Sequence, residues 1–183
     1  MGTPLTNQER REVLVAARRA IADAVAGRRP AELSAEGVFA RRAGAFVSLH
    51  RHGMLRGCIG HISADQPLGQ VLGRCAVAAA TDDPRFPSVT ADELADLHIE
   101  VSILGEVGRV EDVNTIDVGR HGLIMEQRGR KGLLLPQVAT EHRWDRHTFL
   151  SQTCVKAGLA PDAWQHGATI SCFDAEVFGE HER

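Results

Sequence analysis

The segment MLRGCIGH at residues 54–61 follows an apolar run, AFVSL at 45–49, and a turn, HRHG. Two β-prone runs on either side of a glycine-containing turn predict a β-hairpin, with 54–62 as its outgoing strand. That strand is unusual because it holds two glycines, Gly57 and Gly60, which weaken a strand and mark a bulge or a close backbone approach. The fold and the function are therefore best sought around this hairpin.

Successive side chains of a strand point to opposite faces, so Arg56 and Cys58 should leave the same face. Leu55 and Ile59 should then lie on the other face and anchor the strand to a core. The sequence thus predicts a cation and a thiol side by side on an otherwise apolar hairpin, which calls for a chemical or a structural reason.

The rest of the chain mixes hairpins with helices and shows no regular βαβ alternation, which predicts an α+β fold with a largely antiparallel sheet. Thr6 and Glu9 form a capping box that opens a helix, and Asp65 and Asp145 are cap candidates for two more. We expect one compact domain over 1–183, with room for a small second lobe. The elements expected outside the first hairpin are helices to about 26, from the 63–67 start to about 80 and from 145 to 157, strands 35–39, 97–104 and 168–178, a helical turn at 92–94 and a hairpin over 122–135.

Composition excludes some classes of function. The formal net charge is −3, and the aromatic residues are six Phe, two Trp and no Tyr, so neither a basic surface nor a base-stacking platform is indicated. No signal peptide is recognisable, and no apolar run reaches the roughly 18 residues that cross a bilayer. The four cysteines lack zinc-type spacing, so we expect reduced thiols, three of them buried, in a cytoplasmic protein without nucleic-acid or membrane partners.

The chain resembles the AMMECR domain family, the A component of the bacterial AmmeMemoRadiSam system. The resemblance rests first on LRGCIG at 55–60, the six-residue signature of that family. Further matching segments are DPRFP at 83–87, RHGLI at 120–124, GLLLPQVA at 132–139, WDxxxFL at 144–150 and CxKAGL at 154–159.

This resemblance implies a two-lobed α+β fold whose signature lies in a hairpin, and it brings no settled reaction with it. It also implies a Memo-type partner, similar to non-haem iron dioxygenases, and a radical SAM partner. A small-molecule ligand is a further expectation, whereas the oligomeric state stays open.

Cys58 is the first candidate for chemistry, because a thiol becomes nucleophilic when a nearby cation or backbone amides stabilise its thiolate. Arg56 would lower its pKa or hold an anionic substrate, and His61 or His121 would be the base. The alternative is that Cys58 fills a small pocket while Arg56 pairs with a carboxylate of the Asp82-Asp83 loop.

A metal site is a weaker alternative. Cys58 and His61 have C-x-x-H spacing, and His50 and His52 lie across the hairpin, but such a site demands three or four converging ligands. We therefore expect no metal and no cofactor.

A second group of polar residues could line the same site. His121, Glu126 and Gln137 belong to the second hairpin and its exit, and as acid, base or orienting groups they would have to share a cleft with Cys58. The simpler interpretation is that His121 is a turn residue and that the other two are solvated residues at the edge of the sheet. The remaining binding candidates are Gly57, Gly60, Asp82, Asp83 and Arg85.

Two hypotheses follow for the function. In the first, the protein is an enzyme of unknown reaction that uses Cys58 as a nucleophile or redox thiol. In the second, it is a non-catalytic module that binds a ligand, or a Memo-like or radical SAM partner, through the LRGCIG surface, with Cys58 only a contact.

Overall fold

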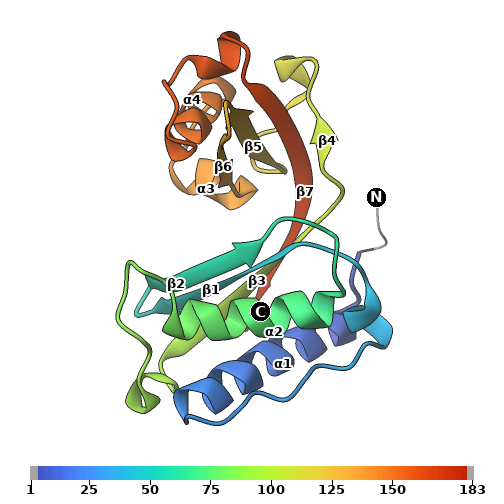
Figure 1. Cartoon of the computed structure of the whole chain (residues 1–183), viewed down its shortest axis with the longest axis vertical. Helices are drawn as coiled ribbons and strands as arrows, with labels where there is room; N and C mark the ends of the chain where they lie inside the picture. The colour runs from blue at the N-terminus through green and yellow to red at the C-terminus, as the bar shows by residue number, and fades with distance from the viewer. Residues whose placement is uncertain (1–3, 181–183) are drawn as a thin grey trace. The chain divides into compact units, whose positions relative to one another are not determined.

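The computed structural model describes residues 4–180, and the chain divides into two compact units. Unit 1 consists of Met1–Leu104 and Glu176–Arg183, and unit 2 consists of Gly105–Ala175. The expected α+β class is confirmed, because helices and antiparallel strands form both units (Figure 1). Among residues 4–180, no helix combines the length and the apolar character that a bilayer crossing requires.

Unit 1 is a layer of two helices on a sheet. The sheet runs in the order β2-β1-β3, and α1 and α2 both cover one of its faces (Figure 1). Because both helices lie on that side, the core of unit 1 forms between helices and sheet. The elements of unit 1 are α1 (Asn7–Val25), η1 (Gly37–Ala40), β1 (Ala45–Arg51), β2 (Met54–His61), α2 (Leu68–Thr81), η2 (Ala91–Glu93) and β3 (Leu97–Leu104).

Alternation along the central strand decides which side chains enter this core. Ala45, Val47 and Leu49 of β1 are fully buried under the helices. Phe46 and Ser48 lie between them in the strand and therefore point to the opposite face. The capping box of α1 is present as expected, with Thr6 Oγ1 accepting from the amide of Glu9.

The predicted first hairpin is confirmed, but the predicted core-facing position of Leu55 in its second strand was wrong. The register of β1 and β2 shifts between Leu49 and His50, so Gly57 pairs with Leu49 and Leu55 pairs with His50. Arg56 is the extra residue of this bulge, which turns the strand and breaks the alternation. Ile59 packs on the core as expected, whereas Leu55 is 38% exposed.

Unit 2 is built on the predicted second hairpin. Its core packs α4 against β5 and β6 around Phe149, Leu150 and Met125. Asp145 caps α4 as expected, by accepting from the amide of Thr148. The elements of unit 2 are β4 (Gly108–Arg109), η3 (Val113–Thr115), β5 (His121–Gln127), β6 (Arg130–Leu134), α3 (Pro136–Glu141), α4 (Arg146–Lys156), η4 (Ala163–Gln165) and most of β7 (Thr169–Gly179).

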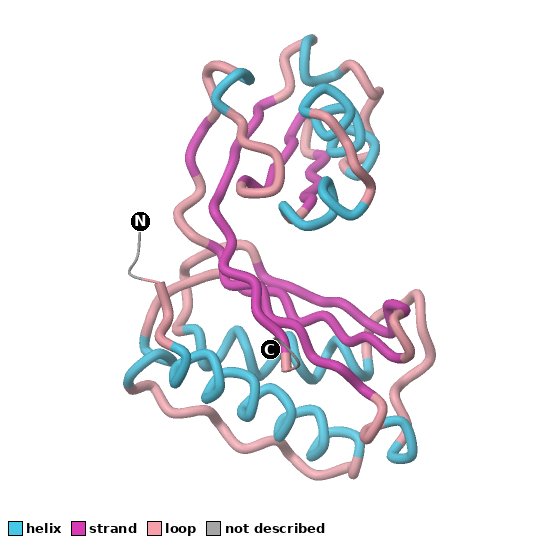
Figure 2. The backbone as a smooth tube through the Cα atoms, turned by 180° about the vertical axis from the view of Figure 1, so that it is seen from behind, coloured by secondary structure: helices cyan, strands magenta, loops and turns pink. Residues whose placement is uncertain are grey.

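One strand belongs to both units. The full strand order is β2-β1-β3-β7-β5-β6, with β4 also paired to β7. The first part of β7 pairs with β5 and β4 in unit 2, and the chain from Glu176 onward belongs to unit 1. Figure 2 shows β7 as a long continuous strand.

Three details differ from the sequence-based expectations. Residues 35–39 form no strand, because Gly37 has a φ of +54° and starts the 3₁₀ turn η1. Asp65 does not cap α2: the helix begins at Leu68, whose amide donates to the carbonyl of Arg41 at 2.7 Å. The short helix α3 was not foreseen.

Candidate functional site

The two glycines of the motif strand permit close packing on opposite faces of β2. A Cβ on Gly57 would lie 2.0 Å from the carbonyl oxygen of Ala79, so this glycine lets α2 approach the strand. A Cβ on Gly60 would lie 2.2 Å from Cδ1 of Phe46, on the face away from the helices. Both glycines are therefore explained by packing of unit 1 itself.

Cys58 lies between these glycines and is half-buried. Ser48, directly across on β1, donates from Oγ to Sγ at 3.2 Å. Burial raises the pKa of the Cys58 thiol, and the carboxylates of Asp83 and Glu100 act in the same direction. The Ser48 hydroxyl and Arg85 oppose this shift without reversing it.

A loop covers the outer edge of β2 at Cys58. Asp83 accepts from the Cys58 amide at 2.8 Å, and Arg85 donates to the Cys58 carbonyl at 3.4 Å. The two side chains also pair with each other at 2.7 Å, and Asp83 is only 4% exposed. They occupy the donor and the acceptor that an edge strand would otherwise leave open.

Asp83 and Arg85, which together clamp the Cys58 backbone, stabilise each other's charged form. Hydrogen bonds from Arg85, then from the amides of Cys58 and Arg85, hold the pKa of Asp83 well below its usual range. The same pairing raises the pKa of Arg85. Asp83 and Arg85 thus form an ionised pair around the motif backbone.

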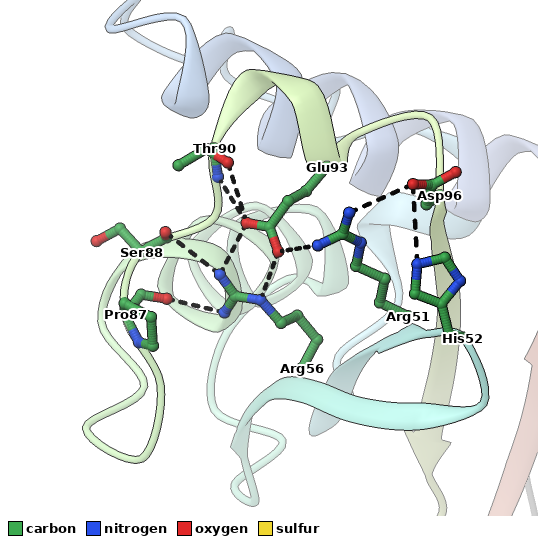
Figure 3. A network of polar contacts seen from close by, with 8 residues as sticks. All are labelled: Arg51, His52, Arg56, Pro87, Ser88, Thr90, Glu93 and Asp96. Atoms are coloured by element: carbon green, nitrogen blue, oxygen red, sulfur yellow. Dashed lines mark hydrogen bonds and ion pairs between the residues drawn. The ribbon is translucent and has the colours of Figure 1, made fainter.

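Arg56 enters a separate network, drawn in Figure 3. Its Nε and Nη2 each donate to Glu93 at 2.9 Å, and its Nη1 donates to the carbonyl of Pro87 at 2.8 Å. Glu93, only 7% exposed, also accepts from Arg51 at 3.1 Å and from the amide of Thr90 at 2.9 Å. These bonds tie the bulge of β2 to the segment before β3.

The network assigns Arg56 a partner that the sequence did not indicate. The expected carboxylate from the Asp82-Asp83 loop is replaced by Glu93, because Asp83 is already bound by Arg85 and Asp82 is exposed. Arg56 lowers the pKa of Glu93 to about 2. It is not among the groups that shift the pKa of Cys58.

The second half of the motif strand borders a pocket of about 270 Å³. His61 lies at its rim, with Nε2 2.8 Å from Oδ1 of Asp65, which lowers the pKa of Asp65. The lining residues are Ile59, Gly60, His61, Gln66, Arg74, Cys75 and Ala78, all in unit 1. Within residues 4–180, no cluster of His, Cys, Asp and Glu could hold a metal ion.

The other candidates lie in unit 2. His121 Nδ1 accepts from the amide of Asp117 at 3.0 Å, and its Nε2 lies 3.6 Å from Asp174. Glu126 lies 3.6 Å from Lys131, and Gln137 is in α3. The structure therefore brings Cys58, Asp83 and Arg85 together in unit 1, and gives His121 and Glu126 partners of their own.

Three residues near Cys58 and Arg56 were missed in the sequence. Ser48 lies between Cys58 and Glu100 in one row across β2, β1 and β3, and Glu93 binds Arg56. A polar residue inside an apolar strand was the available signal for Ser48 and Glu100. Only strand register, which the sequence does not give, aligns them with Cys58.

Comparison with known proteins finds similar chains, and a similar fold, over nearly the whole length. The family model of AMMECR1 matches residues 14–178. Protein Mbar_A1807 of Methanosarcina barkeri is 44% identical over 97% of this chain and 93% of its own length. Protein MJ0810 of Methanocaldococcus jannaschii is 42% identical over 91% and 87%. The crystal structure of the uncharacterized protein PH0010 from Pyrococcus horikoshii matches with a TM-score of 0.91 and 36% identity, covering 97% of this chain and 94% of that one.

Proposed function

We propose, from the premise that this chain belongs to the AMMECR1 family, that it is a non-catalytic binding module and that its motif strand supports a ligand site. One observation carries the proposal: the two arginines that flank Cys58, in the motif and in the 83–87 loop, are each already paired with a carboxylate. Arg85 is held by Asp83, and Arg56 is held by Glu93. Arg56 does not act on the Cys58 thiol, and Arg85 lowers its pKa by less than burial raises it.

The thiol itself supports this proposal. A thiolate is the nucleophile in cysteine chemistry, and burial raises the pKa of Cys58, so the group stays protonated near neutral pH. His61, which follows the motif, has its Nε2 turned to Asp65. A protonated thiol that accepts from Ser48 behaves as a small packing and contact group.

We expect Cys58 to react slowly with iodoacetamide, with an apparent pKa above the value of about 8.5 for a free thiol. The measurement is the rate of alkylation between pH 6 and 10, followed at each cysteine by mass spectrometry of its peptide. Cys75 provides the internal comparison, because burial raises its pKa to about 11.

The control for this experiment is the same protein unfolded in urea, in which all four cysteines should react alike. An apparent pKa of Cys58 below that of the unfolded chain would contradict the binding module and favour the thiol enzyme.

The binding role draws on the open pocket that the second half of the motif borders. Ile59, Gly60 and His61 supply one wall, and Arg74 of α2 lies among the opposing residues. Ligand sites are concave and combine apolar walls with a few polar groups, as this one does.

A second candidate is docking of a Memo-like partner at the turn end of the motif strand, favoured by two exposed apolar residues. Met54 is 71% exposed and Leu55 is 38% exposed, in neighbouring positions of the edge strand β2. We expect the double change Met54→Glu and Leu55→Glu to weaken binding to a purified Memo-like protein at least about tenfold in calorimetry. Val15→Glu on α1, where Val15 is 68% exposed, is the matched control and should leave binding unchanged. Equal binding by all variants would exclude docking at this site.

A further inference from the structure

We propose that the pocket beside Gly60 binds a ligand in which an amide is joined to a carboxylate, such as an N-acylated amino acid or the carboxyl end of a peptide. The inference rests on the proposed binding function and names the ligand class. The pocket offers three kinds of group that together match this chemistry: strand-edge backbone, a side-chain amide with a buried oxygen and a guanidinium.

The backbone of Gly60 supplies the first match. In an antiparallel ladder the outward-pointing N–H and C=O groups recur at every second residue. At Cys58 these groups point away from β1, since they bind Asp83 and Arg85. The register continues unbroken from Ser48–Cys58 to Phe46–Gly60, so the N–H and C=O of Gly60 also point to the edge of the sheet, into the region that Gly60 lines.

The clamp formed by Asp83 and Arg85 ends at Cys58. No side chain among residues 4–180 forms the equivalent bonds with Gly60. An amide group of a ligand can donate to the Gly60 carbonyl and accept from its N–H, as an added strand does.

Gln66 supplies the second match. Its Oε1 is buried but has no hydrogen-bond partner among the described residues, although Gln66 lines the pocket. A buried amide oxygen without a partner is costly, so a ligand that supplies a donor to it would gain affinity. A ligand N–H suits the Gln66 oxygen.

Arg74 supplies the third match. Its side chain is exposed at the pocket and forms no ion pair within residues 4–180. The charge of Arg74 helps to lower the pKa of Asp65, but Oδ1 of that carboxylate is bound to His61. The guanidinium is therefore available to a ligand carboxylate, which it can bind through two parallel hydrogen bonds.

The size and lining of the pocket limit the rest of the ligand. Ile59, Cys75 and Ala78 give it apolar walls, and its volume of about 270 Å³ lies just below the usual range for ligand sites. One acylated residue fits this volume, and a longer peptide would have to extend out of the pocket along the edge of β2.

The test is an NMR titration of the full chain with N-acetylglycine. We expect saturable shifts of the Gly60 amide and the Gln66 side chain, with a dissociation constant in the millimolar range because the ligand is small. N-acetylglycinamide, which lacks the carboxylate, and the Arg74→Gln variant should each bind at least about tenfold more weakly. Arg19→Gln is the matched control, because Arg19 is an exposed helical arginine of α1, and it should bind as the wild type does.

Two further arms distinguish the sources of the carboxylate. Acetyl-triglycine with a free carboxyl end should bind more tightly than N-acetylglycine if the natural ligand is a chain end, and more weakly if it is a free acylated amino acid. The amidated tripeptide should bind weakly in both cases.

The absence of saturable shifts at Gly60, or equal binding by wild type and Arg74→Gln, would overturn the inference. If either result is found and Cys58 is unreactive, the protein is still a binding module, but its ligand is of another class. A reactive, low-pKa Cys58 overturns the proposed function instead, whatever the titration gives.

Discussion

Gly57→Ala is expected to lower the free energy of unfolding by about 3 kcal/mol, the upper part of the range for overpacked cores. The added Cβ would lie 2.0 Å from the carbonyl oxygen of Ala79. That atom belongs to the backbone of α2, so the helix and the strand must separate to admit the methyl group. The measurement is urea denaturation followed by far-UV circular dichroism.

The choice of probe matters because the chain has two units. Both tryptophans, Trp144 and Trp164, belong to unit 2, so their fluorescence reports on that unit. The two longest helices, α1 and α2, belong to unit 1 and give most of its dichroism. The effect of Gly57→Ala should therefore appear first in dichroism.

Gly73→Ala on α2 is the matched control. Its nearest neighbour would be Cδ1 of Leu33 at 4.0 Å, so the methyl group meets open space. Alanine also favours a helix over glycine by up to about 1 kcal/mol, so this variant should be as stable as the wild type or more so. A Gly57→Ala protein that matches Gly73→Ala in stability would show that α2 does not depend on this close approach.

Arg56→Ala is expected to cost about 3 kcal/mol, because it removes the principal partner of a buried carboxylate. Among residues 4–180, Glu93 keeps Arg51 and Thr90 as partners, and the carbonyls of Pro87 and Ser88 lose a donor. The matched control is Arg28→Ala, whose ion pair with Asp23 involves an arginine side chain that is 64% exposed. This surface pair should contribute less than about 1 kcal/mol. Equal losses in the two variants would contradict the buried network.

The same network makes a prediction about pH. The pKa of Glu93 falls from 4.5 to about 2 on folding, so its contribution to stability is complete above about pH 4.5. That contribution is lost as the pH falls from 4.5 towards 2, when the folded carboxyl group takes up a proton. Arg56→Ala removes the largest cause of the shift, so the stability of this variant should fall less steeply in that window than the stability of the wild type.

Local signals in the sequence predicted most of the elements. The capping box at Thr6 and the aspartate at Asp145 fix two helix starts, and turn residues with positive φ, His52 and Gly53, close the first hairpin. These signals act over three or four residues, so a sequence reveals them without knowledge of the fold.

The parts that were not foreseen depend on distant contacts. The first amide of α2 is satisfied by the carbonyl of Arg41, 27 positions earlier (68 minus 41), so no cap residue was needed. The bulge at Arg56 depends on pairing with β1, and it reversed the side expected for Leu55. The partner of Arg56, Glu93, lies 37 positions away, and nothing near Arg56 in the sequence indicates it.

The shared strand β7 has a consequence for the order in which the protein folds. Leu5 bonds to Glu176 over 171 positions, and Arg18 bonds to Glu180 over 162. Closing loops of this length is entropically costly and slow, whereas the contacts of unit 2 fall within 105–175. Unit 2 should therefore form first and draw the ends of its own segment together, which shortens the loop that unit 1 must close. During synthesis on the ribosome, unit 1 cannot be completed until residues 176–180 have been made, and until then the edge of β3 has no partner strand. The nascent chain is most prone to aggregation in this interval.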